Sequence, residues 1–217
     1  MMSAVDREET EKVKKRYDRI SPVYNQLEFV MERMAMAGWR QEFWEKARKN
    51  LQPGDLLLEA GVGTGKNMPY YPEAEEVRIE AIDLSPGMLS RAEARAEELG
   101  IEVNLRKMDI QSLDYPDNHF DLIVTSCVFC SVPDPVLGLK ELKRVCKPAG
   151  KILMLEHMLS EKPVLKNLMN LFNFIPRHIW GANINRRTME NIEKAGLKVN
   201  SVRNLWLDVF KEITLSP

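Results

Sequence analysis

Short apolar runs alternate with longer polar segments along the chain from about residue 53 onward. Five of these runs have the length expected of buried β-strands, and they cover residues 55–59, 77–83, 102–107, 120–125 and 150–156. Helices fit between them at two longer segments, residues 87–99 and 135–146. Strands that alternate with helices form βαβ units, so the pattern predicts a parallel sheet with helices on both faces.

The beginning of the chain has a helical pattern instead. Val13, Tyr17 and Ile20 fall on one face of an expected helix, with basic residues around them. A second helix is expected from about residue 27 to residue 51. We therefore expect residues 1–50 to form a helical cap beside the sheet.

The end of the chain departs from the βαβ pattern. A helix at 187–195 is followed by two expected strands, 197–207 and 209–215, with only Asp208 between them. So short a connection cannot form a parallel crossover, and the last two strands should be antiparallel. The prediction for residues 1–217 is one α/β domain with a Rossmann-like seven-stranded sheet, mostly parallel, ending in an antiparallel β-hairpin.

A glycine-rich segment, Glu59-Ala-Gly61-Val-Gly63-Thr-Gly65, directly follows the first expected strand. Glycines there permit a tight turn and let backbone N–H groups approach a ligand closely. Asp83 ends the next strand, where a carboxylate can accept hydrogen bonds from both hydroxyls of a ribose. The pattern predicts a nucleoside-binding site at this edge of the sheet.

Asp109 follows the third expected strand, where it could meet the amino group of an adenine. The simpler alternative is that the glycines only form a turn and the aspartates only cap helices. Three strand ends that supply three parts of one site, in order, argue against it. An NAD enzyme is the stronger competitor, but it typically has Gly-x-Gly-x-x-Gly spacing and a sixth parallel strand.

Composition narrows the class of protein further. The 217 residues carry a formal net charge of -1, so no overall charge favours nucleic acid. The three cysteines suggest no disulfide framework, and no apolar run is long enough to span a bilayer. The polar first residues do not resemble a secretory signal, and we expect a cytoplasmic protein.

Four segments together resemble the motifs of the class I S-adenosylmethionine (SAM)-dependent methyltransferases. They are Leu58-Glu-Ala-Gly-Val-Gly-Thr-Gly65, Asp83-Leu-Ser-Pro-Gly-Met-Leu89, Phe120-Asp-Leu-Ile123 and Leu142-Lys-Arg-Val-Cys-Lys-Pro-Ala-Gly150. The resemblance covers about residues 10–215. It implies that the nucleoside is that of SAM, with S-adenosylhomocysteine as the product.

Three groups within that family are the most similar: ubiquinone/menaquinone C-methyltransferases, bacterial phosphatidylethanolamine N-methyltransferases and animal methyltransferase-like thiol methyltransferases. The segment 17–24, Tyr-Asp-Arg-Ile-Ser-Pro-Val-Tyr, resembles the first two. The resemblance implies that this segment closes over the cofactor, with Tyr17 and Tyr24 near its methionine end. It also implies further cofactor neighbours, namely Glu59, Leu84, Met88, Ile110 and Ser126.

Methyl transfer from a sulfonium needs alignment more than acid–base help, but an ammonium or thiol acceptor must also lose a proton. His157 lies just past the fifth expected strand, at the edge where ligands bind, and we expect it to contact substrate and to handle that proton. A structural imidazole is the alternative. His178 is a weaker candidate for the acceptor site, and His119 is expected at the surface.

Cys127 and Cys130 form a C-x-x-C pair after the fourth expected strand. Zinc needs three or four ligands, and no second pair lies at suitable spacing, so no metal is expected. The pair follows a strand and does not open a helix, unlike redox pairs. We expect Cys127 beside the cofactor and Cys130 beside the acceptor.

Residues 163–175 form an expected helix with a wide apolar face, followed by Trp180. Ordinary core packing would explain much of that face. The sharper hypothesis is that residues 158–186 are an insertion that covers a lipid-like or aromatic acceptor, with Trp180 among its contacts. The insertion could also touch a membrane surface, and the basic residues near Tyr17 could add contacts to anionic head groups.

The sequence therefore predicts methyl transfer from SAM to a small hydrophobic or lipid-linked acceptor, with a phospholipid amine favoured. A quinone-ring carbon and a small thiol are the alternatives. A SAM-binding module without turnover is the non-enzyme alternative, which the intact Gly61, Gly63, Gly65, Asp83 and Asp109 argue against. Nothing in the motifs supports a nucleic-acid substrate.

Overall fold

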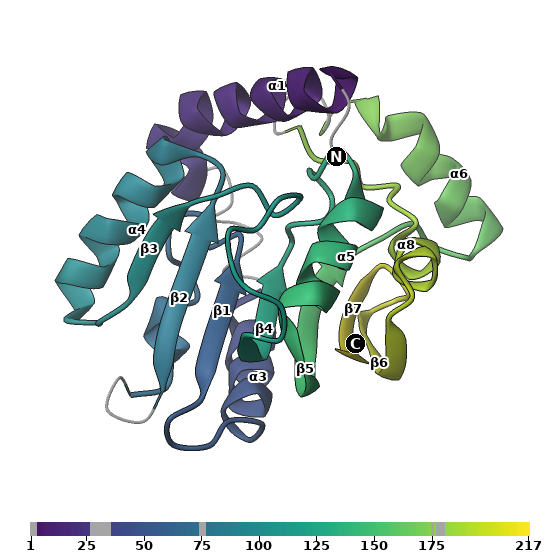
Figure 1. Ribbon diagram of the computed structural model, residues 1–217. Helices are drawn as coiled ribbons and strands as arrows, with labels where there is room; N and C mark the ends of the chain where they lie inside the picture. Colours follow the sequence, from purple (N-terminus) through teal and green to yellow (C-terminus); the bar gives the residue numbers. More distant parts are fainter. Residues whose placement is uncertain (1–3, 27–35, 74–76, 175, 177–180) are drawn as a thin grey trace.

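The computed structural model describes residues 4–26, 36–73, 77–174, 176 and 181–217. One seven-stranded sheet forms its centre, with the order β3-β2-β1-β4-β5-β7-β6 (Figure 1). The strands are β1 (Leu56–Ala60), β2 (Arg78–Asp83), β3 (Asn104–Lys107), β4 (Phe120–Ser126), β5 (Cys146–His157), β6 (Lys198–Trp206) and β7 (Phe210–Ser216). The first five strands pair in parallel, and β7 is antiparallel to both β5 and β6. The predicted fold is confirmed, including its terminal hairpin.

The strand order reverses between β1 and β4. The chain moves outward from β1 through β2 to β3, and then returns to pair β4 with the other side of β1. The loops that follow β1 and β4 therefore diverge to opposite sides, which opens a crevice at the carboxyl edge of the sheet. The glycine-rich segment lies in this crevice.

Helices cover both faces of the sheet. A buried apolar cluster joins one face to α3 (Ala37–Arg48) and α4 (Pro86–Leu99). A second cluster joins the other face to α5 (Pro135–Val145) and α8 (Thr188–Ala195). In β1 the successive Leu57 and Leu58 belong to the first and second cluster respectively, because neighbouring strand residues point to opposite faces.

Local chemistry fixes where α4 and α5 begin. The Ser85 hydroxyl accepts a hydrogen bond from the Met88 backbone N–H, and the Asp134 carboxylate accepts one from the Leu137 N–H. Each capping residue is followed by a proline, which suits the first helical turn. These caps hold both helix N-termini at the carboxyl edge of the sheet, next to the crevice.

Two further helices lie outside the layered core. The long helix α1 (Ala4–Ile20) crosses above the carboxyl ends of the strands, and α6 (Pro163–Phe172) lies at the right edge of the view in Figure 1. Two short 3-10 helices, η1 (Ser21–Val23) and η3 (Met68–Tyr70), follow α1 and the glycine-rich segment. Of the second N-terminal helix, residues 27–35 lie outside the described residues.

The bounds of several predicted strands differ in the structure. β5 begins at Cys146 and not at residue 150, so it follows α5 without a loop. Its first part is a bulge, because a register shift lies between the pairs of Phe120 and Leu122. A Cβ on Gly150 would lie 2.8 Å from the Asp121 carbonyl oxygen, so the close approach there requires glycine. β3 begins two residues later than predicted, and β6 and β7 are joined by three residues, 207–209.

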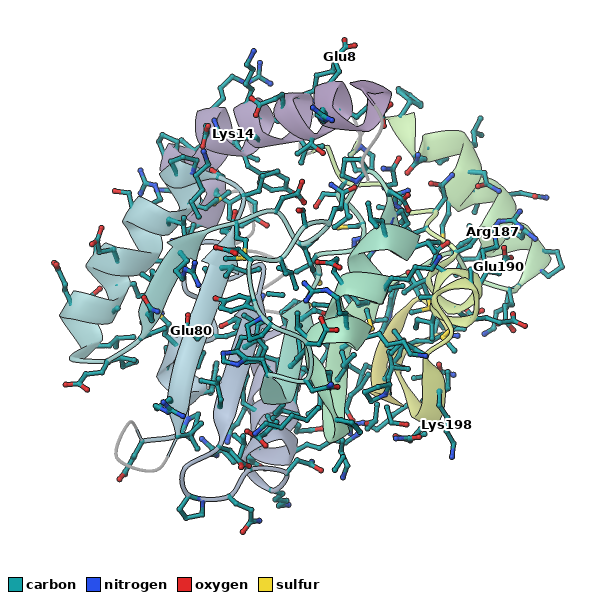
Figure 2. The ribbon with its side chains drawn as sticks, viewed as in Figure 1. Glu8, Lys14, Glu80, Arg187, Glu190 and Lys198 are labelled. Atoms are coloured by element: carbon teal, nitrogen blue, oxygen red, sulfur yellow. The ribbon has the colours of Figure 1, made fainter. Side chains whose placement is uncertain are left out.

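Many of the charged side chains lie on the outside of the molecule, as Figure 2 shows for Glu8 on α1 and Lys198 at the start of β6. None of the helices in the described part of the chain has the length and apolar character needed to cross a membrane.

Candidate active site

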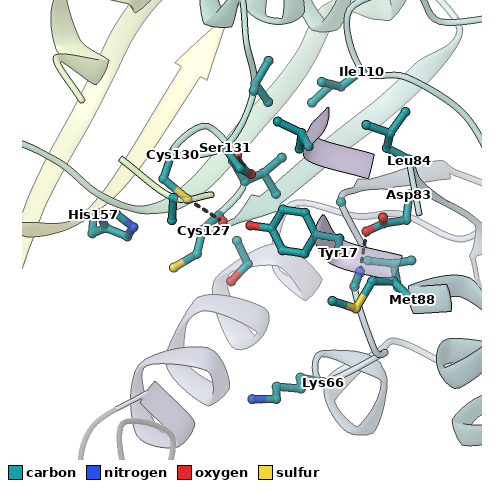
Figure 3. A pocket seen from close by; sticks show the side chains of 18 of the residues that line it. Tyr17, Lys66, Asp83, Leu84, Met88, Ile110, Cys127, Cys130, Ser131 and His157 are labelled. Atoms are coloured by element: carbon teal, nitrogen blue, oxygen red, sulfur yellow. Dashed lines mark hydrogen bonds between the residues drawn. The ribbon is translucent and has the colours of Figure 1, made fainter. Parts of the chain in front are cut away.

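A cavity of about 500 Å³ opens at the carboxyl edge of the sheet, below α1. Its walls come from α1, the glycine-rich segment, the ends of β2, β4 and β5, the inner side of α6, and the hairpin of β6 and β7. Figure 3 shows Tyr17 in the middle of this cavity. Asp83, Leu84, Met88 and Ile110 lie on one side of the ring, and Cys127, Cys130 and His157 lie on the other.

The glycine-rich segment folds back against β2. The N–H groups of Gly61 and Val62 both donate to the Ile82 carbonyl oxygen, at 2.8 and 2.9 Å. Gly61 has a φ of +86°, and a Cβ there would lie 2.4 Å from a methyl carbon of Val128. Only glycine fits this position, for reasons of both backbone conformation and space. Gly61 and Gly63 line the cavity, whereas Gly65 packs on Met68 and does not.

Asp83 links the glycine-rich segment to the start of α4. One carboxylate oxygen accepts the Gly63 N–H at 2.9 Å, and the other accepts the Ser85 N–H at 2.9 Å. Burial raises the pKa of Asp83 to about 6, and the nearby charge of Asp18 adds to this effect. A carboxylate oxygen can accept a second hydrogen bond, so Asp83 retains acceptor capacity toward the cavity that it lines.

Asp109 and Ile110 line the cavity beside Gln111, which the sequence analysis missed. An Asp109 carboxylate oxygen accepts the Gln111 N–H at 2.9 Å, and the Gln111 amide also donates to Thr10 of α1 at 3.1 Å. The Gln111 side-chain oxygen accepts the Asp134 N–H at 2.8 Å. Gln111 therefore connects α1, the loop after β3 and the start of α5, which no local spacing indicates.

Glu59 is fully buried beneath the glycine-rich segment and does not line the cavity. Its carboxylate accepts hydrogen bonds from the Asn67 amide, at 2.6 Å, and from the Tyr71 hydroxyl. Burial raises the pKa of Glu59 to about 7, although these two donors and the charge of Arg40 lower it. Glu59 therefore affects the cavity indirectly, because its partner Asn67 lines the cavity.

Arg40 is the most informative residue that sequence reasoning missed. It is 6% exposed, lines the cavity, and donates to the Asn67 side-chain oxygen at 2.7 Å and to the Ser126 hydroxyl at 3.1 Å. Arg40 lies on the same helix face as Phe43, Trp44 and Ala47, all fully buried in α3. The sequence pattern that indicates such a residue is a single arginine on an otherwise apolar helix face.

Tyr17 and Tyr24 both line the cavity, with ring centroids 6.2 Å apart. Tyr17 belongs to α1 and Tyr24 follows η1. The ammonium of Lys66 lies 5.6 Å from the centroid of the Tyr24 ring, which joins this segment to the loop after β1. The structure brings together the two tyrosines that the resemblance implied.

His157 ends β5 and lines the opposite end of the cavity from Asp83 (Figure 3). Its ring centroid lies 5.7 Å from that of Phe210, the residue with which it pairs across the sheet. Burial lowers the pKa of His157 to about 4, so the imidazole is neutral near pH 7. A neutral ring nitrogen can accept a proton or a hydrogen bond.

Cys127 and Cys130 also line this end of the cavity. Cys127 has a φ of +56°, which is uncommon for a residue with a side chain, and its N–H donates to the Leu155 carbonyl oxygen at 2.8 Å. The Cys130 thiol donates to the Cys127 carbonyl oxygen at 3.2 Å. Burial raises the pKa of Cys130 to about 12, so it remains a thiol. The described residues contain no group of three potential ligands that could hold a metal ion.

Glu156 supports the turn that carries these cysteines. It is fully buried, and one carboxylate oxygen accepts the Val128 N–H at 3.0 Å and the Thr125 hydroxyl at 3.1 Å. The other oxygen has no hydrogen-bond partner among the described residues. Burial raises the pKa of Glu156 to about 7.

The remaining walls near His157 are apolar. Leu165 and Met169 come from α6, and Trp206, Val209 and Phe210 come from the hairpin. Trp206 was not predicted as a site residue. The predicted acceptor contacts His178 and Trp180 lie outside the described residues.

A doubly wound α/β sheet with a glycine turn after β1, a carboxylate at the end of β2 and a terminal antiparallel hairpin defines a nucleoside-binding protein of the methyltransferase type. Residues 58–154 match the family model described as a methyltransferase domain. The chain is 31% identical over 161 residues to a demethylmenaquinone methyltransferase of Alkalihalophilus pseudofirmus, a match that covers 73% of this chain and 67% of that one. The chain belongs to the class I SAM-dependent methyltransferases.

Two other comparisons agree with this assignment. A phosphatidylethanolamine N-methyltransferase of Cereibacter sphaeroides is 39% identical over 111 residues, and the match covers 50% of this chain and 54% of the relative. This chain thus aligns with only about half the length of that relative. A crystal structure of a SAM-dependent methyltransferase from Aquifex aeolicus has the same fold, with a TM-score of 0.60 and 24% identity, over 80% of this chain and 89% of that one.

Proposed function

We propose that this methyltransferase transfers the methyl group of SAM to the amine of a phospholipid head group. The observation that carries the proposal is the composition of the cavity end away from Asp83. There, one neutral imidazole, His157, lies among apolar side chains of α6 and the hairpin. Such a site suits an acceptor that has one ionisable group on an apolar body. The similarity to the phosphatidylethanolamine N-methyltransferase supports the same choice.

The residues at the other end fit the SAM nucleoside. Gly61 lets the turn pack closely on Val128 and lines the cavity, Asp83 offers acceptor capacity for ribose hydroxyls, and we assign Asp109 and Ile110 to the adenine. When bound, SAM supplies a methyl group on a positively charged sulfur. We assign Arg40 and Lys66, the two basic side chains among the described residues that line the cavity, to the carboxylate of its methionine part.

The chain's own residues then position the acceptor. His157 accepts a hydrogen bond from the amine N–H and takes up the proton, so the nitrogen lone pair points toward the methyl carbon. With SAM bound, the nitrogen would take the methyl group, and the sulfur would keep the electron pair of the broken carbon–sulfur bond. Tyr17 separates the two ends of the cavity and excludes water from the line of transfer. We also propose that residues 1–50 and 158–186 serve as the cap and the acceptor cover.

Methylation of a quinone-ring carbon is the second candidate. The 31% identity to the demethylmenaquinone methyltransferase over 73% of the chain favours it. The same apolar walls would accept a ring with a prenyl tail, and His157 would take the ring proton.

A matched acceptor panel separates these candidates. The protein is incubated with isotopically methyl-labelled SAM and with phosphatidylethanolamine, a demethylmenaquinol or a small thiol, each in detergent micelles. Of the three acceptors, we expect only phosphatidylethanolamine to give S-adenosylhomocysteine release and a labelled monomethyl amine. Label in the quinol ring, or in the thiol, without label in the lipid would overturn the proposal. The Asp83→Asn variant serves as the control for background transfer.

A further inference from the structure

Exposed apolar side chains concentrate on one part of the molecule. We define the apolar rim as six described residues on α6 and at the end of the hairpin: Val164, Leu168, Leu171, Phe172, Trp206 and Leu207. Their exposed fractions range from 46% to 75%. Side chains of this size on a water-soluble surface are costly when they are contiguous, and such patches mark interaction sites.

Hydrogen bonds join the two halves of the apolar rim. The Asp208 carboxylate, in the turn between β6 and β7, accepts from the Ser160 hydroxyl and from the Glu161 N–H, each at 2.7 Å. The Met158 N–H donates to the Val209 carbonyl oxygen at 2.8 Å. The start of α6 and the end of the hairpin are therefore one fixed unit, so their exposed side chains form one surface.

The other sides of α6 are already occupied. Asn173 accepts the Ile184 N–H at 2.8 Å, and Asn170 accepts from the Asn185 amide at 3.0 Å. Leu165 and Met169 line the cavity. The apolar rim is therefore the outward face of a helix whose inward face belongs to the site.

The cavity and the apolar rim share one side chain, that of Trp206. Trp206 lines the cavity and is also 52% exposed, so it borders an opening. A folded protein seated on the rim would cover this opening, whereas a lipid surface would leave it in contact with apolar molecules. Tryptophan is also the side chain that favours the boundary between lipid and water.

The charge of α6 points to the same partner. Lys162 and Lys166 flank the apolar residues, and no acidic residue occurs from position 162 to position 172. Lysines beside an apolar face favour an anionic lipid surface by about 1 kcal/mol each, while their stems remain on the apolar side. A short helix with this pattern lies in the interface between lipid and water and does not span the membrane.

We propose that the apolar rim docks on the surface of a lipid bilayer that contains anionic lipids, with the cavity mouth open to the bilayer. The proposal of docking rests on the observations of the apolar rim. Only its purpose, the delivery of a lipid-linked acceptor, rests on the proposed function.

Co-sedimentation with vesicles tests this proposal. The probes are vesicles of phosphatidylcholine alone and of phosphatidylcholine mixed with phosphatidylglycerol. We expect the protein to bind the mixed vesicles more tightly. The triple variant Val164→Gln, Leu168→Gln, Leu171→Gln should partition at least about tenfold more weakly, because it removes three apolar insertions. The matched control is Val199→Gln, Val202→Gln on β6, which removes exposed valines away from the rim and should bind as the unaltered protein does.

Three results would overturn the proposal: no binding to either vesicle, equal binding by the triple variant, or a dimer that the triple variant converts to a monomer in light scattering. The last would assign the rim to a second copy of the chain. Unchanged SAM affinity in calorimetry verifies that the triple variant is folded. Vesicle binding without transfer to phosphatidylethanolamine in micelles would refute the proposed acceptor and leave the docking intact.

Discussion

The Asp83 carboxylate accepts hydrogen bonds from the Gly63 and Ser85 N–H groups. It also lines the end of the cavity that we assign to SAM. In Asp83→Asn, one carboxylate oxygen becomes an amide nitrogen, so only one of the Gly63 and Ser85 N–H groups keeps its acceptor. We expect SAM to bind about 100-fold more weakly, since a charge-assisted hydrogen bond contributes about 2–3 kcal/mol. Isothermal titration measures the dissociation constant. Asp114→Asn is the matched control, because the Asp114 side chain is 91% exposed.

His157 is the residue on which the proposed proton transfer depends. We expect His157→Gln to keep its SAM affinity and lose at least about 100-fold in turnover, the usual range for a lost acid–base group. His119→Gln, at the opposite edge of the sheet, should retain turnover. Because the pKa of His157 is lowered to about 4, its protonation should not reduce turnover between pH 5 and pH 8. A step in the rate near pH 6.5 that vanishes in His157→Gln would contradict this assignment.

At the scale of elements, α1 is held over the cavity by a few polar contacts. The Asp18 carboxylate accepts from the Ser85 hydroxyl at 2.6 Å and from the Gly87 N–H at 3.1 Å. A Cβ on Gly87 would lie 3.3 Å from the Asp18 carbonyl oxygen, so the glycine permits this close approach. The position of Tyr17 therefore depends on the neighbouring Asp18.

Asp18→Ala should release α1 from the start of α4 while the layered core remains intact. We expect SAM to dissociate about tenfold faster, in line with the loss of one or two hydrogen bonds, with little change in the melting temperature. Stopped-flow displacement of SAM measures the rate. In the control Glu8→Ala the pair with Lys12 is lost from the exposed side of α1, and the rate should not change. Equal rates for Asp18→Ala and the unaltered protein would show that α1 does not cover the cofactor.

At the scale of the whole molecule, burial raises the pKa values of three carboxyl groups, Glu59, Asp83 and Glu156, to about 7, 6 and 7. These three carboxyl groups lie at or next to the carboxyl ends of β1, β2 and β5. A group whose folded pKa exceeds its unfolded value binds protons more readily in the folded state. The free energy of unfolding therefore falls as pH rises through that window.

Glu156→Gln isolates one of these groups. As pH rises from the ordinary pKa of 4.5 to the folded value of about 7, the free energy of unfolding should fall by roughly 3 kcal/mol in the unaltered protein. The variant should not show this fall. Urea unfolding of both proteins from pH 5 to pH 8 measures the difference, which should grow with pH in favour of the variant. Glu141→Gln should show no such change between pH 5 and pH 8, because the pKa of Glu141 is lowered from 4.5 and the group is ionised in both the folded and the unfolded state over this range. A difference that does not depend on pH would refute the raised pKa.

The sequence by itself determined the sheet, the terminal hairpin, the glycine turn and Asp83. These features follow from local rules: the spacing of apolar residues, the length of a connection, and the backbone conformation that only glycine adopts easily. The pattern does not determine every boundary, since β5 begins at Cys146, the last residue of the helix predicted at 135–146. Its bulge depends on a neighbouring strand that lies elsewhere in the sequence.

Tertiary structure alone decided which side chains meet. It turned Glu59 away from the cavity and placed Arg40 of α3 in it, through contacts with Asn67 and Ser126. It also placed Trp206 in the cavity wall while leaving it half exposed. These placements depend on packing between segments far apart in the chain, and no spacing within one segment encodes them. The proposed cofactor site follows the ends of consecutive strands, so local patterns in the sequence indicate it, whereas the proposed acceptor site is assembled from α6, the hairpin and β5.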